Sequence, residues 1–359
     1  MGRFILKRFW YGLLVMFGVV IVVFFLFNIL PGDPARMMLG QRADSASVAA
    51  INRDLGRDRP VMVQFAGYLN DLSPLSFHDV TNRSSYWYPD PGKYGKVLPL
   101  ITVGNTTMVL KEPCLRRSYQ SKRAVTEILA EAFTGTAVLA LAAMAFAVVA
   151  GIGIGIVCAL YRNSFIDRIS LVFSVLGMSL PSFFVAILNA WIFAFLLAGI
   201  TGLNMTGSLF AVDDFGRGTY PDLKNLILPA LTLGIRPLAI IVELTRNSLL
   251  EVMTQDYIRT ARAKGLGQAK IILRHALKNA LNPVVTAISG WLASLLAGAV
   301  FVEFIFDWKG MGVVIVNALD KYDFPVVMGA VLFISVLLIV INFLVDILYG
   351  WLDPRIRVG

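Results

Sequence analysis

The sequence predicts an all-α integral membrane protein with six transmembrane helices, because apolar residues dominate it and occur in long runs. Hydrophobic residues make up 57% of the 359 residues and charged residues only 15%, whereas about a quarter of the residues in soluble domains are charged. A helix needs about 20 apolar residues to cross the core of a bilayer. Six runs approach or reach that length: residues 10–30, 133–160, 170–199, 226–249, 284–306 and 326–350.

The first of these runs, residues 10–30, is expected to be a retained helix. A basic stub with Arg3, Lys7 and Arg8 precedes it, as in a signal peptide. However, the apolar run is too long for a typical signal sequence, and LPGDPARMM after it contains no small-x-small cleavage site. We therefore interpret residues 1–30 as an N-terminal tail followed by the first transmembrane helix.

Basic residues in the short loops predict which side of the membrane each loop faces. Arg or Lys occur in the N-terminal stub and in residues 161–168, 250–283 and 353–359. With six spans these four segments lie on one side, which the positive-inside rule identifies as the cytoplasm. We therefore expect a multi-pass protein of the plasma (inner) membrane with cytoplasmic N- and C-termini. The same rule accounts for the net charge of +9 without nucleic acid as a partner.

Residues 31–131 are predicted to form a large extracytoplasmic cap region after the first helix. They also carry many Arg and Lys residues, but long loops translocate largely regardless of charge. Their Pro, Gly, Asn and aromatic content, as in SSYWYPDPGKYGK, indicates an ordered cap more than a linker. The remaining residues, 132–359, are expected to form a five-helix core with a cytoplasmic loop at 250–283.

Cysteine and histidine are too sparse to predict a metal site or a catalytic centre. The predicted topology puts Cys114 and Cys158 near opposite membrane faces, so no disulfide is expected. His78 and His275 are far apart and have no cluster of cysteines or carboxylates around them. A membrane enzyme would need a nucleophile with a base, or a metal set, which two such histidines do not supply.

The stretch DYIRTARAKGLGQAKIILRHALKNALNP, residues 256–283, is unusually polar for its place between two apolar runs. Thr254 is a candidate N-cap, Asp256 suits the first turn of a helix, and Gly265 is a candidate C-terminal stop. A second helix is predicted from about Gln268 to Pro283. The pattern is therefore helix, glycine turn, helix, folded back on the cytoplasmic side.

The second of these helices is predicted to be amphipathic. Leu273, Leu277 and Leu281 recur every four residues, and another face carries basic residues, namely Lys270, Arg274 and Lys278. Two interpretations remain open: a helix lying on anionic lipid headgroups, or a hairpin that docks into a groove of a partner protein. The glycine turn and the chain reversal favour docking.

The same stretch resembles the coupling loop of ABC importer permeases, in particular the dipeptide/oligopeptide branch. Further segments that resemble this branch are FNILPGDPA, LGRDRPVMVQFAGYLNDL, LPALTLGI with LTRNSLLEV, VFVEFIFDWKGMG and NFLVDILYGWLDPRIR. The Glu of the generic motif is absent, because Arg259-Thr260-Ala261 stands there, and Lys278 replaces a common Pro. Between about residues 73 and 123 the resemblance lapses, which indicates an insertion.

The resemblance implies a six-helix permease subunit that forms half of a translocation pathway for di- or oligopeptides. It implies four kinds of partner: two cytoplasmic ATP-binding subunits, a second permease subunit that is a different chain, an extracytoplasmic solute-binding protein and membrane lipid. ATP and Mg would lie on the partner ATPases, with no cofactor in this chain. In agreement, the sequence lacks the GxxxxGK[ST] phosphate-binding loop. Gly151 and Gly155 are interpreted as a helix-packing motif.

Two sets of candidate site residues follow. The resemblance implies that the coupling loop contacts the ATPase through Asp256, Tyr257, Arg259, Thr260, Arg262, Ala263, Lys264, Gly265 and Leu266. Charged residues within or beside the spans are candidates for the translocation path because such charges are costly in a membrane; these are Arg236, Glu303 and Asp307.

For Arg236, just before the helix-kinking Pro237, two roles remain open: binding a peptide carboxylate, or pairing with a residue such as Glu243. Glu303 and Asp307 lie beside WKGMG, whose glycines permit a sharp turn or re-entrant segment.

Alternative functions also remain open. One is a proton-coupled secondary transporter, although intramembrane acids are few and no repeat is evident. The other is an ABC permease for a non-peptide solute such as a nickel chelate.

Overall fold

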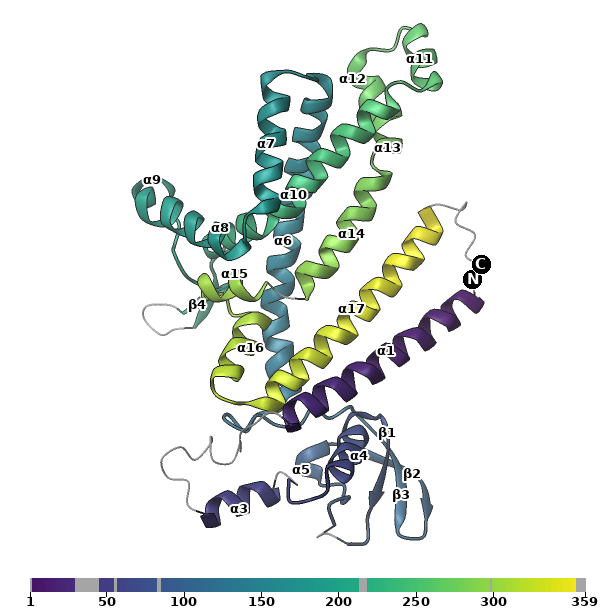
Figure 1. Ribbon diagram of the computed structural model, residues 1–359, viewed down its shortest axis with the longest axis vertical. Helices are drawn as coiled ribbons and strands as arrows, with labels where there is room; N and C mark the ends of the chain where they lie inside the picture. The colour runs from purple at the N-terminus through teal and green to yellow at the C-terminus, as the bar shows by residue number, and fades with distance from the viewer. Residues whose placement is uncertain are drawn as a thin grey trace. The chain divides into compact units, whose positions relative to one another are not determined.

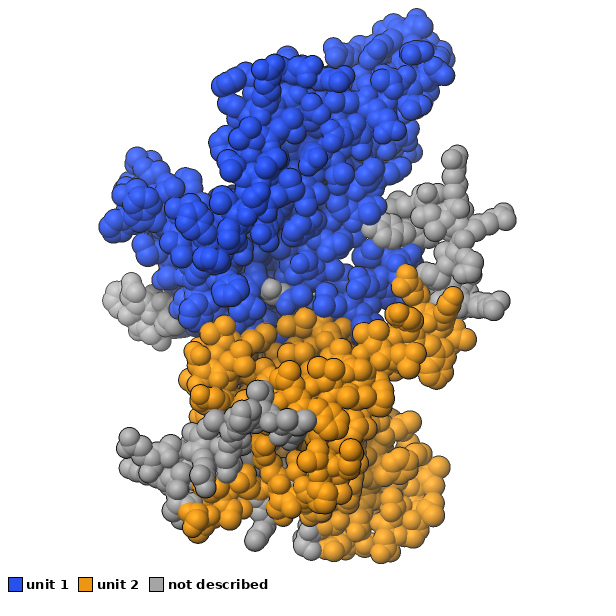
Figure 2. Space-filling view, viewed as in Figure 1, with its two compact units in different colours: residues 1–4, 132–313, 337–359 blue, residues 5–131, 314–336 orange. Residues whose placement is uncertain are grey.

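A computed structural model of the chain describes residues 2–29, 45–54, 57–82, 85–212, 218–297 and 299–352. The chain divides into two compact units, coloured separately in Figure 2. The first unit comprises residues 1–4, 132–313 and 337–359, and the second unit comprises residues 5–131 and 314–336.

The first unit is a helical bundle in which α6 (Val125–Leu160) packs closely against α10 (Lys224–Val252) (Figure 1). A methyl group added at Gly155 would lie 2.6 Å from Cβ of Thr245, and one at Gly151 would lie 2.8 Å from Cγ2 of Ile241. Such distances leave no room for a side chain, so these two small residues let the helices approach. The predicted helix-packing role of both glycines is confirmed.

The predicted span at 170–199 is not one straight helix. Instead α7 (Phe165–Ser179) is followed by α8 (Ser182–Asn189) and the π-helix η2 (Ala190–Leu196), with a bend of 113° between the two parts. The break falls at Leu180, which is extended because the following Pro181 disfavours the helical conformation before it. Pro181 then becomes the N-cap of α8.

Short elements connect this bent pair to α10. The helix α9 (Ala198–Thr201) ends at Gly202, whose φ is +60°. Two antiparallel strands, β4 (Phe210–Val212) and β5 (Thr219–Pro221), then lead into α10.

The predicted span at 284–306 is also interrupted. It consists of α14 (Asn282–Leu296), which has 15 residues, and the separate short helix α15 (Val300–Ile305). Two helices that follow, α16 (Met311–Asp320) and α17 (Phe324–Leu352), contribute residues to both units. Within the described residues, four helices are long and apolar enough to cross a membrane, or five spans if the bent pair counts as one, so six spans are not confirmed.

The second unit contains α1 (Gly2–Ile29, from Ile5 onward), α3 (Ser45–Asp54), α4 (Val61–Leu72) and α5 (Pro91–Tyr94). It also contains β1 (Leu75–Asp79), β2 (Val97–Val103) and β3 (Thr106–Lys111), which form an antiparallel sheet in the order β1-β3-β2. The prediction of an all-α protein is therefore wrong.

Burial along the strands of this sheet follows the pleat, and its hairpin turn contains a glycine. Buried and exposed residues alternate along β1 and β3, as expected for strands with one face covered. A two-residue turn joins β2 to β3, and its Gly104 has a φ of +61°, which favours glycine at this position of a hairpin. These short strands lie in the segment for which the family resemblance lapses.

The apolar core of the second unit lies between α1, α4 and the start of α17. Phe24 is 1% exposed and its ring centroid lies 5.0 Å from that of Phe65 and 5.5 Å from that of Tyr68. Met328 and Leu332 of α17 complete this core. Burial of several large side chains in one cluster makes the segment after α1 a folded body instead of a linker.

A charged cluster at the end of α4, called the Asp71 cluster, consists of Asp71, Lys93, Tyr94, Lys111 and Arg116. The Asp71 carboxylate accepts hydrogen bonds from Lys93 Nζ (2.7 Å), the Tyr94 hydroxyl (2.6 Å) and Arg116 Nε (3.0 Å). Lys111 Nζ donates to the Asp71 main-chain carbonyl at 2.7 Å. Burial alone would raise the pKa of Asp71, but Arg116 and Lys93 outweigh it and hold that pKa below its usual value.

Candidate functional site

A helical hairpin follows α10 in the first unit. It consists of α11 (Asp256–Ala263), α12 (Gln268–Lys270), the π-helix η3 (Ile271–Ala276) and α13 (Leu277–Ala280). In Figure 1, α11 lies beyond the end of α10, and the chain returns through α12 and α13 toward α14. The predicted order of helix, glycine turn and helix is confirmed.

The start of α11 differs in one respect from the prediction. Gln255 is the N-cap, and its side chain makes no capping hydrogen bond. The Thr254 hydroxyl donates instead to the Glu251 carbonyl at 2.7 Å, so Thr254 belongs to the end of the preceding helix and its predicted capping role is wrong. Asp256 does occupy the first turn of α11, as predicted, where the helix dipole favours a negative charge.

The end of α11 is a Schellman motif centred on Gly265. The Gly265 N–H donates to the Arg262 carbonyl at 2.9 Å, and the Leu266 N–H donates to the Ala261 carbonyl at 3.3 Å. Gly265 has a φ of +75°, a conformation that is strained for any residue with a Cβ. The predicted glycine stop is confirmed.

One side of α11 is anchored in an apolar cluster. Ile258 is fully buried and Ala261 is 7% exposed. They pack together with Leu249 of α10 and with Ile271 and Ile272 of η3. This anchor was not predicted, although two apolar residues three apart in an otherwise polar helix are a signal for it.

The other side of α11 and the following turn form an exposed surface, which we call the docking face. It contains the nine residues predicted to contact an ATPase: Asp256, Tyr257, Arg259, Thr260, Arg262, Ala263, Lys264 and Gly265 are exposed and Leu266 is half-buried. The Arg259–Asp256 pair, at 3.4 Å, is mostly exposed, and such pairs contribute little to stability. Three cations and one acid are therefore available to a partner.

A hydrogen bond joins the two arms of the hairpin. Asn279 Nδ2 donates to the Tyr257 hydroxyl at 2.8 Å. This bond orients Tyr257, which is 41% exposed, against α13. Asn279 was not among the predicted site residues, because nothing in the local pattern indicates which residue would face α11.

The buried side of the second arm differs from the prediction. Ile271, Ile272, Ala276 and Ala280 are buried, whereas Leu273 is 65% exposed. The prediction assumed α-helical spacing, but residues 271–276 form a π-helix, which has more residues per turn and rotates the later side chains.

Arg236 lies in α10 opposite the break between α7 and α8. Its Nη2 donates to the Leu180 carbonyl at 3.3 Å, and its Nε is buried and has no hydrogen-bond partner among the described residues. The expected alternative partner, Glu243, makes no recorded ion pair with Arg236 within the described part of the chain. Arg236 also lines a cavity of about 210 Å³.

Glu303 lies in a different environment from Arg236. It is fully buried and accepts hydrogen bonds from the Thr136 hydroxyl at 2.7 Å and from the Gly312 N–H at 2.6 Å. A methyl group added at Gly310 would lie 2.6 Å from the carboxyl carbon of Glu303. Glu303 therefore braces the turn after α15, and it does not line the Arg236 cavity. Asp307 is exposed in that turn and has a φ of +51°.

A buried ion pair links the start of α7 to α10. Arg246 donates from Nε and Nη2 to the two carboxylate oxygens of Asp167, at 2.6 Å and 2.8 Å. The Asp167 side chain is 2% exposed and that of Arg246 is 14% exposed. Two parallel bonds of this kind fix the orientation of both side chains.

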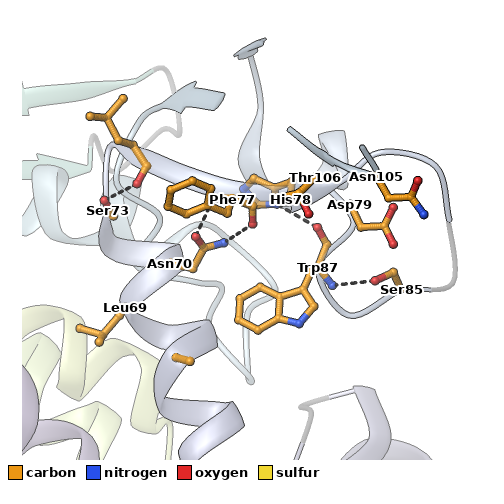
Figure 3. Close-up of a pocket in the computed structure, with 12 residues that line it drawn as sticks. Leu69, Asn70, Ser73, Phe77, His78, Asp79, Ser85, Trp87, Asn105 and Thr106 are labelled. Atoms are coloured by element: carbon orange, nitrogen blue, oxygen red, sulfur yellow. Dashed lines mark hydrogen bonds between the residues drawn. The ribbon is translucent and has the colours of Figure 1, made fainter. Parts of the chain in front are cut away.

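A larger cavity of about 640 Å³ lies in the second unit between α4 and β1 (Figure 3). The Asn70 amide at its wall is already used, because it accepts from the Phe77 N–H at 2.8 Å and donates to the Phe77 carbonyl at 3.0 Å. Nδ1 of His78 lies 3.1 Å from the Trp87 carbonyl. Burial lowers the pKa of His78. Asn70 therefore holds β1 against α4, and the His78–Trp87 contact joins β1 to the loop that carries Trp87.

Closely packed helices of membrane-spanning length, together with an exposed helical hairpin after α10, are features of an integral membrane protein. Residues 151–358 match the family described as the binding-protein-dependent transport system inner membrane component. Residues 1–83 match the N-terminal region described for the membrane component of such systems. The chain belongs to this family.

Relatives along the whole chain have peptide permease names. The dipeptide transport system permease protein DppB of Alkalihalophilus pseudofirmus is 34% identical over 356 residues, covering 96% of each chain. The di/tripeptide transport system permease protein DppB of Pseudomonas aeruginosa is 34% identical over 377 residues, covering 99% of each. The glutathione transport system permease protein GsiC of Pectobacterium atrosepticum is 36% identical over 347 residues, covering 96% of each.

A solved structure of the MetNI methionine ABC transporter in an inward-facing conformation aligns with 64% of this chain and 97% of its own chain, at 18% identity and a TM-score of 0.48. That likeness is too weak to add to the assignment. Membership of the family makes the chain a permease subunit of an ABC importer, which is a transport subunit and not itself an enzyme. The family also implies ATPase and binding-protein partners.

Proposed function

We propose that this chain forms half of the translocation pathway of an ATP-driven importer of di- or oligopeptides. Family membership carries the transport role, and the names of three relatives, which specify dipeptide, di/tripeptide and glutathione transport, favour a peptide as the solute. The other half would come from a second permease subunit of different sequence. The solute would be delivered by an extracytoplasmic binding protein.

The docking face would couple this pathway to two cytoplasmic ATP-binding subunits, which carry ATP and Mg. The observation that carries this proposal is the two-sided construction of α11. Ile258 and Ala261 fasten one side to the protein, while the opposite side presents Arg259, Arg262 and Lys264 to solvent. A helix fixed in this way transmits a displacement at its exposed side to α10 and η3 because the packed cluster moves with it.

This arrangement also favours a protein partner over lipid headgroups. A membrane-surface helix buries its apolar side in the bilayer. The apolar side of α11 is instead occupied by packing against the chain itself, which leaves a polar surface for contact.

The proposed topology places six spans in the inner membrane, with α14 and α15 together as the fifth, and places both termini and the hairpin in the cytoplasm. The cap region at 31–131 would then be extracytoplasmic, followed by the core at 132–359. The unit boundary between Glu131 and Ala132 coincides with the end of the cap region, although residues 5–30 and 314–336 belong to the same unit as the cap. Arg236 and Asp307 would line the translocation path, and Glu303 would support the turn that carries Asp307.

Co-purification tests the docking face. The tagged chain is expressed with the ATP-binding subunits encoded beside it, as wild type, as Ala263→Trp and as the matched control Ala269→Trp. Both alanines are exposed and helical, but only Ala263 lies on the docking face. We expect Ala263→Trp to lose the ATPase while the permease still elutes as a folded, membrane-extracted protein.

The control variant should keep the ATPase bound. Equal recovery of the ATPase with wild type and Ala263→Trp would rule out α11 as the docking element. Loss with both variants would mean that the contact extends over the whole hairpin and is not confined to α11.

A further inference from the structure

The break between α7 and α8 opens onto a cavity of about 210 Å³ in the first unit. Three segments far apart in the sequence meet there: the break itself, the middle of α10, and α14. Polar groups of Leu180, Ser182, Thr232, Arg236 and Ser294 are among those that line the cavity. Among the described residues that line the cavity, none is acidic.

The guanidinium of Arg236 is only partly used by the chain. It has five N–H donors, and the Leu180 carbonyl accepts one of them at 3.3 Å. Nε is buried and unpartnered among the described residues. A buried donor without an acceptor is rare in folded proteins, so this cation is suited to an acceptor that the chain itself does not provide.

The N-terminus of α8 adds to the positive character of this cavity. Pro181 is its N-cap without a side-chain capping bond, and Ser182, the first helical residue, lines the cavity. The first N–H groups of a helix have no partner within the helix, and the helix dipole makes that end positive. Continuation of α8 into η2 lengthens the helical run behind this end.

The hydroxyl groups differ in their availability. Thr232 is buried, and its Oγ1 already accepts a hydrogen bond from Asn189 Nδ2 at 2.9 Å. Ser294 of α14 is exposed, so its hydroxyl can reach a molecule in the cavity. Arg236, the N-terminus of α8 and Ser294 therefore form a set of donors around one space.

We propose that this cavity is a carboxylate-binding subsite that holds the C-terminal carboxylate of the transported peptide; this rests on the proposed function above. A guanidinium can bind a carboxylate through two parallel hydrogen bonds. Arg236 lies 12 residues into α10, about 18 Å along its axis, which is near the middle of this long apolar helix. Secondary transporters bind solutes at that depth beside broken helices, and the break between α7 and α8 offers the same arrangement of a helix end beside a cavity.

The size of the cavity limits what it can hold. Pockets for complete small-molecule ligands are about 300–1,000 Å³, and this one is smaller. It therefore accommodates one end of a peptide, and the remainder would lie outside the chain, where a second permease subunit would face it.

Thiol modification at Ser294→Cys tests the subsite in the assembled transporter. The background is Cys114→Ser with Cys158→Ala, which removes both natural thiols. Modification rates are measured with a sulfonate-bearing and a trimethylammonium-bearing methanethiosulfonate. We expect Arg236→Gln to lower the ratio of the sulfonate rate to the trimethylammonium rate by about tenfold, because it removes a nearby positive charge. Phe165→Cys is the control, because Phe165 is exposed at the start of α7, 15 residues before Leu180, and does not line the cavity; its reagent ratio should not change.

Protection by solutes identifies the ligand group. Alanylalanine is expected to slow the modification of Ser294→Cys, whereas its C-terminal amide is not. Acetate and acetamide form a second pair with the same expectation. An unchanged reagent ratio in Arg236→Gln would overturn the subsite and leave Arg236 as a brace for Leu180. Equal protection by an acid and its amide would also overturn it.

Failure of the proposed function gives a different result. If the solute is not a peptide, acetate protects and the reagent ratio still depends on Arg236, but alanylalanine gives no protection. That outcome overturns the peptide carboxylate as the occupant.

If Arg236→Gln does not assemble, Arg236→Lys tests the same site. The positive charge is kept, so the reagent ratio should persist. Protection by alanylalanine should weaken, because a lysine ammonium cannot form the two parallel hydrogen bonds of a guanidinium. Undiminished protection in Arg236→Lys would count against the proposal.

Discussion

The helical hairpin and the Asp71 cluster both concentrate charged residues, but their charges face opposite environments. On the docking face, Arg259, Arg262 and Lys264 are exposed and make few contacts with the chain. In the Asp71 cluster, the single carboxylate is 2% exposed and accepts three side-chain hydrogen bonds. The first arrangement leaves its charges free for a partner, whereas the second uses them to hold a fold together.

The comparison shows that charge density alone does not distinguish a functional surface from a structural one. The distinction is whether each charged group has hydrogen-bond or ion-pair partners within the chain. A buried charge must be paired because its desolvation is costly, and an exposed charge need not be. Arg236 is intermediate, since it is partly buried and only partly paired. Its free N–H groups are therefore available to a ligand.

The largest expected effect is that of Asp71→Asn. Removing the carboxylate leaves Lys93 and Arg116 close together without a counter-charge, which should cost about 3–5 kcal/mol of stability in the second unit. Hydrogen–deuterium exchange of residues 61–116 in the full chain would measure this as faster opening. Glu112→Gln is the control, because Glu112 is an exposed carboxylate in the same range and its replacement should change exchange little. Equal exchange in wild type and Asp71→Asn would contradict a stabilising role for the cluster.

Acid should weaken the same region. The pKa of Asp71 is held below its usual value in the folded chain, because the neighbouring Arg116 and Lys93 outweigh the effect of burial. The stabilisation is therefore complete above the unfolded-state pKa of about 3.9 and is lost as the pH falls through the folded-state pKa. Opening of residues 61–116 should accelerate at about pH 3 relative to pH 6, and Asp71→Asn should be less sensitive to this change. Identical pH profiles for the two proteins would exclude Asp71 as the responsible group.

Arg246→Gln should have an intermediate effect on the first unit. It breaks both hydrogen bonds to the buried Asp167, and bonds to charged groups contribute about 1.5–3 kcal/mol. Thermal unfolding of the detergent-solubilised chain would report the loss. Asp167→Asn in combination with Arg246→Gln should recover part of it, because the double variant leaves no buried unpaired charge. An additive loss in the double variant would show that the pair does not act as a unit.

Arg259→Gln should have the smallest effect on stability and the clearest effect on partner binding. The Arg259–Asp256 pair is exposed, so its loss should cost less than about 1 kcal/mol. On the proposed docking face, however, the same change should weaken ATPase recovery in the co-purification assay. A marked drop in thermal stability would show that Arg259 is structural, contrary to the contrast drawn here.

Several local features were predictable from short-range chemistry. The Gly265 stop requires only a residue that tolerates a positive φ, and the Gly151 and Gly155 spacing directly indicates a close helix contact. The exposed docking residues followed from polarity and from the family resemblance. The strands of the second unit were missed. The sequence of β1 alternates and Gly104 was visible, but the buried residues of β1 are the polar Ser76 and His78, and β3 shows no such alternation in its sequence.

The remaining features depend on contacts between distant segments. The pairing of Asn279 with Tyr257 and of Asp167 with Arg246 joins residues 22 and 79 positions apart. The shifted face of the second hairpin arm depends on a π-helix, which α-helical spacing does not anticipate.

The sequence by itself determined that this chain is a membrane protein with a polar hairpin at residues 256–280, because apolar run length, loop charge and glycine position are local properties. Its permease role followed from the resemblance of its motifs to a family. Only the tertiary structure decided which charged groups have hydrogen-bond partners within the chain. It separated Glu303, enclosed by Thr136 and the Gly312 backbone, from Arg236, whose buried Nε has no partner in the described chain. Whether a charged group has such partners depends on what surrounds it in space, and distant segments of the chain supply those surroundings.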